Sequence, residues 1–278
     1  MTYRDILVQI DETPASAARA ITAAGLAAKF QAQLTGVFLK SEFLQNYMAA
    51  DAMAYMSPSD IDRLLKEHAA ATLKASEDAR ERFERAASEA GVVSDWQVID
   101  GDYDGALVAY ARRFDLTVMP PVATAALGTN RVSAADLGLA SGGPVLVVGE
   151  GGGSPHVGKK ILVAWKGTRE SARALRDALP LLMTADEVHV LVVSPHGEGG
   201  PDGALQRHLE RHGLQAKLIV DPSEDVSAAE VLRRQVKALK ADLVVMGLYG
   251  RPRMQELVLG GVSHDLLRDP PAALLISH

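Results

Sequence analysis

The stretch Leu243-Val-Val-Met-Gly-Leu-Tyr-Gly-Arg-Pro-Arg-Met-Gln-Glu-Leu-Val-Leu-Gly-Gly-Val-Ser263 carries most of the information about fold and function in this chain. It opens with four apolar residues that end at Met246, which predicts a strand buried on both faces. Gly247 and Gly250 follow directly, and a second glycine pair comes after nine intervening residues. Residues 264–268 then predict the start of a helix. The stretch therefore predicts a strand, a glycine-rich connection and a helix.

Such a connection is suited to binding a phosphate group. Glycines at the carboxyl end of a strand let the backbone approach a ligand and adopt positive φ. A glycine pair before a helix presents backbone N–H groups, and the helix dipole favours an anion there. Ser263 adds a hydroxyl donor. The alternative interpretation is a glycine-rich turn that only allows the strand and the helix to pack.

The spacing Gly-x2-Gly-x9-Gly, followed by a small residue, Val and Ser, resembles the nucleotide loop of the universal stress protein family. In ATP-binding members of that family, this loop holds the ribose and the phosphates. The residues that match the motif are Gly247, Gly250, Gly260, Val262 and Ser263. Gly261 stands where many members carry Ser or Thr, so one side-chain donor is lost while the backbone N–H remains.

Length and composition indicate a globular protein with two domains. The chain has 278 residues, of which 47% are hydrophobic and 23% charged. No apolar run reaches the roughly 18–20 residues that a membrane span needs, and no signal peptide is visible. Cysteine is absent, which excludes disulfides, thiolate metal sites and cysteine nucleophiles. We therefore expect a cytoplasmic protein without membrane contact.

The net charge of −6 is unevenly distributed. Residues 1–150 contain 13 Lys and Arg against 20 Asp and Glu, or −7, whereas residues 151–278 contain 16 against 15, or +1. An acidic chain argues against nonspecific binding of nucleic acid. The less acidic part contains the glycine-rich loop.

The sequence contains an internal repeat. Residues 6–11 match residues 161–166, and residues 116–119 match residues 243–246. The glycine-rich segment 150–156 lies between the copies and has the composition of a linker. Expected strands cover 5–11, 34–39, 94–99, 116–119 and 144–148, then 160–166, 187–193, 215–220, 243–246 and 273–277. Expected helices cover 15–31, 59–90 and 105–114, then 170–182, 203–212 and 226–240, with a last one starting at 264.

Strands that alternate with helices imply a parallel sheet with right-handed crossovers. We predict an α/β protein of two tandem doubly wound domains, over residues 1–150 and 157–278. The family resemblance implies the adenine nucleotide alpha hydrolase-like fold for each domain. It also implies an internal pseudo-dimer, in which residues 145–148 and 273–277 pair and cover the open sheet edges.

The two copies differ in the loop. Met119 to Pro144 and Met246 to Pro271 are equally long, which predicts that the first copy keeps the loop length without gaps. On that alignment the first copy has Pro120 for Gly247, Ala123 for Gly250, Ser133 for Gly260, Ala134 for Gly261 and Asp136 for Ser263. The prolines remove backbone donors, and the aspartate adds a negative charge. We therefore expect residues 1–150 to be a degenerate domain that holds no triphosphate.

The second copy departs from the family elsewhere. ATP-binding members usually carry an acid at the end of the first strand; the first copy has Asp11 there, and the second has Lys166. The lysine could contact phosphates, or it could be a solvated side chain that marks relaxed adenine recognition. The resemblance further implies that Ala164 and Val193 line the adenine pocket, with Met246 beside it. For the loop residues Arg251 and Arg253, two interpretations are open: contact with phosphates, or a position at a solvated loop tip.

Other groups of polar residues give weaker signals. His208 and His212 have a spacing that can bind metal, but no third ligand is evident, so a charged helix face is the better interpretation. Asp100, Asp102 and Asp104 form an acidic turn. Such a turn could bind a cation, but it more often only ends one secondary-structure element and caps the next. Methionines and tyrosines gather in residues 41–60. Core packing is the favoured interpretation, because methionine fills irregular gaps, and a lid or a partner surface are the alternatives.

The leading hypothesis is a stress-response regulatory protein that binds ATP, possibly with Mg²⁺, through the C-terminal loop without efficient catalysis. The first alternative is a slow Mg²⁺-dependent ATPase, although the sequence shows no nucleophile and base. The second is a nucleotide-free interaction protein, in which Gly261 and Lys166 mark decay of the site. Expected partners are an adenine nucleotide, a protein that the sequence does not identify, and a second copy of the chain in a homodimer. No nucleic acid is expected.

Overall fold

The computed structural model describes residues 2–41, 57–101, 105–126, 131–150, 153–194, 203–223, 225–248 and 261–278. The strands of the main sheet are β1 (Asp5–Gln9), β2 (Gln33–Lys40), β3 (Ser94–Asp100), β4 (Leu116–Met119), β7 (Val145–Val147), β8 (Lys160–Ala164), β9 (Glu187–Val193), β10 (Ala216–Asp221), β11 (Leu243–Gly247) and β12 (Ala273–Ser277). The helices are α1 (Ala15–Phe30), α3 (Pro58–Glu89), α4 (Ala106–Ala111), α5 (Ala134–Ser141), α6 (Arg169–Leu182), α7 (Gly203–Arg211), α8 (Ala228–Leu239) and α10 (Val262–Arg268).

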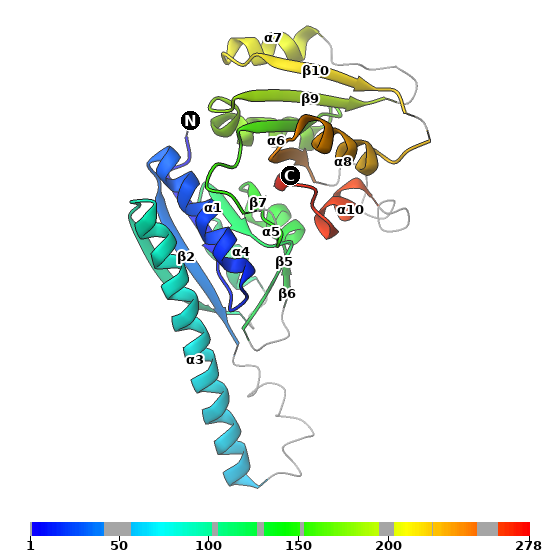
Figure 1. The fold of residues 1–278 in the computed structure, drawn as a ribbon. Coiled ribbons are helices and arrows are strands. Elements are labelled where there is room, and N and C mark those ends of the chain that lie inside the picture. Colours follow the sequence, from blue (N-terminus) through cyan, green and yellow to red (C-terminus); the bar gives the residue numbers. More distant parts are fainter. Residues whose placement is uncertain are drawn as a thin grey trace.

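The ten main strands form one sheet in the order β10-β9-β8-β11-β12-β7-β4-β1-β2-β3 (Figure 1). All neighbours run parallel except β12 and β7, which pair antiparallel with Leu275 opposite Leu146. Each half contributes five strands to this sheet. Numbered along the chain within their half, these strands are in the order third, second, first, fourth and fifth from the outer edge of the sheet to its middle. The predicted fold class and the predicted pairing of the last strands are therefore confirmed.

Helices cover both faces of the sheet, so the molecule has three layers. In β1, Ile6 and Val8 belong to one buried apolar cluster, and Leu7 belongs to the cluster on the opposite face. This alternation is the two-residue period of a strand that is buried on both sides. The helices α1, α3, α6 and α7 pack on the first cluster, and α4, α5, α8 and α10 on the second.

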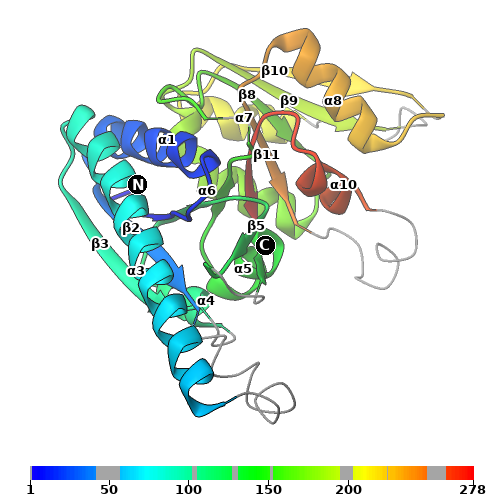
Figure 2. The same cartoon turned by 60° about the horizontal axis from the view of Figure 1, so that its bottom comes forward.

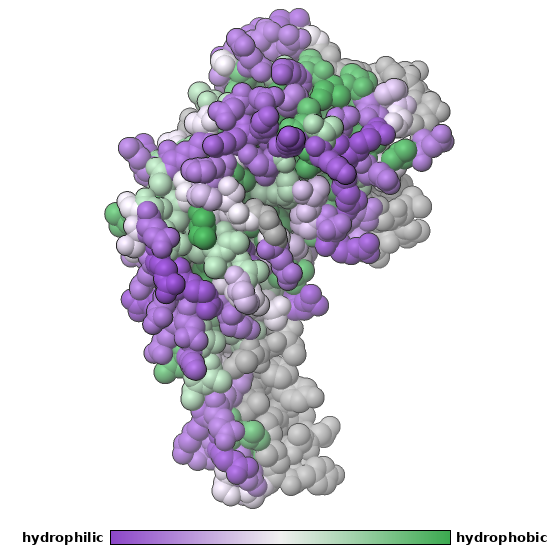
Figure 3. All heavy atoms as spheres, viewed as in Figure 1, coloured by the Kyte–Doolittle hydropathy of each residue, from purple (hydrophilic) through white to green (hydrophobic). Residues whose placement is uncertain are grey.

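Helix α3 is the longest helix and lies beside α1 in both ribbon views (Figures 1 and 2). Its side chains become buried only from Thr72 onward, and its N-terminal part projects beyond the sheet. The face shown in Figure 3 is largely hydrophilic along this helix. The predicted helix 59–90 is confirmed, with Ser57 as its N-cap and Gly91 in the left-handed region after it. Most of the predicted Met- and Tyr-rich segment, residues 42–56, lies outside the described residues.

An aspartate before the fourth strand marks the repeat. In the first half, the carboxylate of Asp115 accepts the backbone N–H groups of Arg4 and Asp5, at 2.7 and 3.1 Å. In the second half, the carboxylate of Asp242 accepts those of Gly158 and Lys159, at 2.8 and 3.0 Å. Each carboxylate thus fixes the start of the first strand of its own half beside the start of the fourth.

The prediction that the loop keeps its length in the first half is wrong. Across the pair of fourth and fifth strands, Thr117 lies opposite Val145 and Val244 lies opposite Leu274. These partners are 28 positions apart in the first half and 30 in the second, so the first connection is two residues shorter. The shorter connection forms an antiparallel pair that was not predicted, β5 (Val122–Thr124) with β6 (Arg131–Ser133). A helix follows both connections, and its preceding residue is Ser133 in one half and Gly261 in the other.

The segment after Glu150 is not a free linker over its described part. The backbone N–H of Ser154 donates to the hydroxyl of Thr22 on α1, at 2.9 Å. A Cβ atom on Gly25 would lie only 2.2 Å from the carbonyl oxygen of Pro155. The side chain of Val157 is buried. The connection between the halves is therefore packed against α1, and the glycine at position 25 permits the close approach.

Helix α6 adds further contacts with the first half. The hydroxyl of Tyr3 donates to the carbonyl oxygen of Asp177 at 2.6 Å, and burial raises the pKa of this tyrosine. The guanidinium of Arg173 donates to the carbonyl oxygen of Gly142 at 2.9 Å. Over the described ranges, no helix has the length and hydrophobicity needed to cross a bilayer.

We expect Gly25→Ala to destabilise the protein by about 1–3 kcal/mol, because the new methyl group overpacks the junction with Pro155. In an unhindered helix the same change would stabilise by roughly 1 kcal/mol. Urea unfolding measures the difference, with Ile21→Ala, at a position 41% exposed on the same helix, as control. A Gly25→Ala protein as stable as the wild type would show that this junction is loosely packed.

Candidate functional site

The strand order reverses in the second half between β8 and β11. From β8 the chain continues outward to β9, whereas β11 leads to β12 on the other side. In open α/β sheets, ligands bind in the crevice that such a reversal leaves at the carboxyl ends of the strands. Ala164 ends β8 and Gly247 ends β11, so both border this crevice.

The structure brings several of the predicted adenine-pocket residues together. Ala164, Val193 and Val262 are partly exposed and pack on the same buried cluster, which contains Met246. Lys166 lies two residues beyond β8 and is exposed. The predicted adenine-pocket residues Ala164, Val193 and Met246 therefore lie on one face of the sheet, together with the loop-motif residue Val262. The predicted loop residues Gly250, Arg251, Arg253 and Gly260 lie outside the described residues, as do Asp102 and Asp104 of the acidic turn.

Gly247 is required by the packing of the protein itself. A Cβ atom at this position would lie 2.5 Å from the carbonyl carbon of Glu170, in the first turn of α6. The pKa of the Glu170 carboxyl group is lowered, mainly because its carboxylate accepts a hydrogen bond from the backbone N–H of the same residue. The close approach of α6 therefore requires glycine at position 247 whether or not a ligand binds. For this position, a role in packing is sufficient to explain the glycine.

The helices that follow the two loops start differently. Gly261 is the N-cap of α10, with φ −61° and ψ 150°, and it has no side chain with which to cap the helix. At the start of α5, the hydroxyl of Ser133 accepts the backbone N–H of Asp136 at 3.0 Å and donates to its carboxylate at 2.5 Å. The first half therefore caps its own helix and places a negative charge there. Ser263, in the first turn of α10, is 3% exposed.

Comparisons with known proteins agree with this fold. Residues 158–278 match the sequence model of the universal stress protein family. Over these residues, the second half of the chain is similar to the universal stress protein family. A universal stress protein from Archaeoglobus fulgidus is 16% identical and has a TM-score of 0.66, with 98% of this chain and 97% of that chain covered.

Two further solved structures extend the comparison. A Pseudomonas aeruginosa protein assigned to the family is 17% identical, with a TM-score of 0.57 and coverage of 99% of this chain and 93% of that one. A universal stress protein in complex with cAMP is 19% identical over 43% of this chain and 97% of its own, but its TM-score of 0.33 supports no inference about ligands here. No curated protein matches the sequence.

The first half of the chain uses the acid at the end of β1 for structure. The carboxylate of Asp11 accepts the backbone N–H of Thr13 at 2.9 Å and forms an ion pair with the guanidinium of Arg19. The side chain of Arg19 is 3% exposed and also donates to the carbonyl oxygen of Gln9 at 3.2 Å. Burial lowers the pKa of Arg19, and Asp11 opposes that effect.

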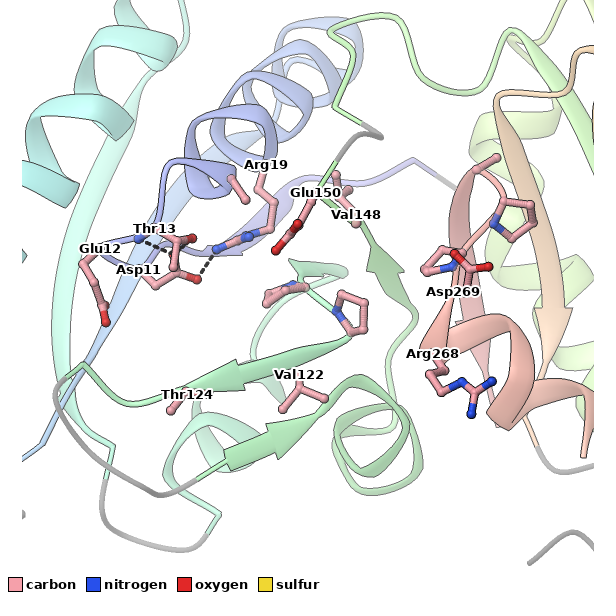
Figure 4. A pocket seen from close by; sticks show the side chains of 17 residues that line it. Asp11, Glu12, Thr13, Arg19, Val122, Thr124, Val148, Glu150, Arg268 and Asp269 are labelled. Carbon is pink, nitrogen blue, oxygen red and sulfur yellow. Dashed lines mark hydrogen bonds and ion pairs between the residues drawn. The ribbon is translucent and has the colours of Figure 1, made fainter. Parts of the chain in front are cut away.

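Sequence reasoning missed Arg19. The available signal was that it is the only arginine in the alanine-rich helix α1 and follows an acid at the end of β1. A buried cation needs a partner, and Asp11 was the nearest acid before the helix. The same reasoning missed a cavity of about 750 Å³ that Asp11 and Arg19 line, together with residues 268–272 of the second half (Figure 4).

Asp221, at the end of β10, forms a further polar cluster at the outer edge of the second half. Its carboxylate accepts the hydroxyl of Ser223 at 2.5 Å and the guanidinium of Arg234 at 2.6 Å. These hydrogen bonds, that of Ser223 first, lower the pKa of Asp221 from 3.8 to about 2. The ionised form is therefore favoured in the folded protein.

We expect Asp11→Asn to destabilise the protein by roughly 3 kcal/mol, because it leaves the buried Arg19 without an ion-pair partner. The neighbouring Glu12→Gln is the control, since Glu12 is exposed, and it should unfold like the wild type. Urea denaturation at pH 7 measures both. Equal stability of the two variants would contradict a structural role for Asp11.

We expect the stabilising effect of Asp221 to be present above about pH 4 and to be lost as the pH falls toward 2, because its folded-state pKa is depressed. Asp221→Asn should lower the unfolding midpoint in urea at pH 7, and the difference from the wild type should shrink at pH 2.5. The exposed Asp225→Asn should match the wild type at both pH values. A difference for Asp221→Asn that is constant with pH would contradict this account.

Proposed function

We propose that this protein binds ATP in the crevice between β8 and β11 and acts as a regulatory protein in stress responses, without efficient catalysis. The observation that supports this most strongly is the reversal of strand order in the half that matches the family sequence. The glycine-rich loop begins at the end of β11, directly at that reversal. General experience with open α/β sheets makes this crevice the first place to expect a nucleotide.

The proposed adenine site consists of Ala164, Val193 and Met246. These three share one face of the sheet, and the first two are only partly buried, so they offer apolar surface to a base. In this arrangement the exposed Lys166 would extend its ammonium group toward phosphates, which would compensate for the missing acid of other family members.

The proposed phosphate site consists of the backbone between Gly247 and Val262, with Gly250, Gly260 and Gly261 in it, and of Ser263. It is supported by the contrast between the halves: α5 is capped by Ser133 with a carboxylate beside it, whereas Gly261, the N-cap of α10, has no side chain. A Mg²⁺ ion would accompany the nucleotide and balance phosphate charge. By the same contrast, we propose that the degenerate first half binds no triphosphate.

Bound ATP would favour an ordered loop, because a ligand stabilises the state to which it binds. The loop and the start of α10 would then offer a different surface to a protein partner. The proposed output is therefore binding of a partner that depends on the nucleotide, in a cytoplasmic protein.

We expect Gly261→Asp to abolish ATP binding while the protein keeps its stability. The backbone at Gly261 has an extended conformation that any residue can adopt, and aspartate is a favourable N-cap. Its charge would lie where a phosphate is proposed. Isothermal titration with MgATP measures the affinity, and ion-exchange chromatography of denatured protein measures the nucleotide carried through purification.

Gly261→Asn is the matched control, because asparagine caps a helix equally well and carries no charge. It should bind ATP within a few-fold of the wild type. Failure of the wild type to bind or carry a nucleotide would overturn the proposal and leave an interaction protein. Equal binding by both variants would place the phosphates elsewhere.

A further inference from the structure

The cavity of about 750 Å³ lies at the carboxyl ends of β1 and β4, where the strand order of the first half reverses. Its size falls within the range of about 300–1,000 Å³ that is usual for small-molecule sites. Figure 4 shows Asp11, Glu12 and Arg19 on one wall, with Arg268 and Asp269 on the opposite wall. Both halves of the chain therefore build this cavity.

The cavity offers little to an anion. Four prolines line it and supply no backbone N–H: Pro120, Pro121, Pro270 and Pro271. The guanidinium of Arg19 is already paired with Asp11. The nearby start of α5 is capped by its own Ser133 and carries the charge of Asp136. A phosphate group would find neither a backbone cradle nor an available buried cation.

Carboxylates converge on the same cavity from three separate elements. Glu12 follows β1, Glu150 follows β7 and Asp269 follows α10. Within the described residues, none of these three side chains has a hydrogen-bond or ion-pair partner. With Asp11 and Arg19 neutralising each other, three carboxylates face the single guanidinium of Arg268, which gives the lining a net charge of −2.

We propose that this cavity binds a small organic cation with two amino groups. The hydrocarbon part would lie against the prolines and the side chains of Val122 and Val148. The ammonium groups would meet Glu150 and Asp269, which come from opposite halves of the chain. A crevice lined by charges of one sign concentrates counter-ions of the other sign, so binding weakens as the salt concentration rises.

This site is separate from the proposed nucleotide site, and its ligand has the opposite charge. The two crevices occupy equivalent places in the two halves of the sheet, at the reversals β1/β4 and β8/β11. The chain would therefore hold a cation in one half and an anion in the other.

The test uses three linear probes of similar length: 1,5-diaminopentane, 1,5-pentanediol and glutarate, titrated calorimetrically into the full chain at low ionic strength. We expect the diamine alone to bind, one per chain, and to weaken on addition of 0.3 M NaCl. Glu150→Gln with Asp269→Asn should reduce diamine affinity about tenfold or more, because it removes two charge-assisted contacts. Both side chains are exposed and unpaired, so thermal unfolding of this variant should match the wild type.

Two controls separate this site from the rest of the surface. Glu77→Gln removes an exposed carboxylate on α3 and should leave diamine binding unchanged. The Gly261→Asp variant, in which the proposed phosphate site is disabled, should bind the diamine with the affinity of the wild type. The diamine experiment is therefore independent of the proposed nucleotide site. Absence of diamine binding at millimolar concentration, binding that the double variant leaves intact, or equal binding of glutarate would each overturn the proposal.

Discussion

The antiparallel pairing of β12 with β7 is the constraint on which the rest of the structure depends. Each half alone would expose an open strand at this edge, where unpaired backbone groups invite association. Joining them gives one continuous sheet and buries apolar side chains of both strands, such as Leu146 and Leu275. Because the pairing is antiparallel, the carboxyl ends of the two half-sheets point in opposite directions.

The opposite direction of the two half-sheets decides which residues border each crevice. The start of β12 lies beside the end of β7, so residues 268–272 of the second half close the crevice of the first. In the equivalent place of the second half, a Cβ atom on Gly138 of α5 would lie 2.8 Å from the side chain of Leu248, which follows β11. The first half therefore needs the second to complete its strand-end crevice, and α5 of the first half packs closely on the residue that follows β11.

The strand and helix pattern was largely predictable because buried parallel strands and amphipathic helices leave periodic signals. β9 is an example in which the predicted bounds are the observed ones, Glu187–Val193. Helix α5 and the β5–β6 pair were missed because they are short, and because the gap-free alignment imposed the loop of the second half on the first. The packing of the connection on α1 could not be predicted, since composition describes the freedom of an isolated segment and not the surface it meets.

For the candidate site, the sequence identified which residues come from strand ends but not why each is there. Gly247 matches a ligand-binding motif, yet the approach of Glu170 is sufficient to require glycine. Asp11 matches the acid of nucleotide-binding relatives, yet Arg19 and Thr13 use its carboxylate. Gly261 is different: its backbone is extended, which any residue adopts, so its own conformation does not require glycine. Gly261 thus leaves the start of α10 without the side-chain cap that Ser133 provides for α5. This difference between the two helix starts supports the proposal that the two crevices bind ligands of opposite charge.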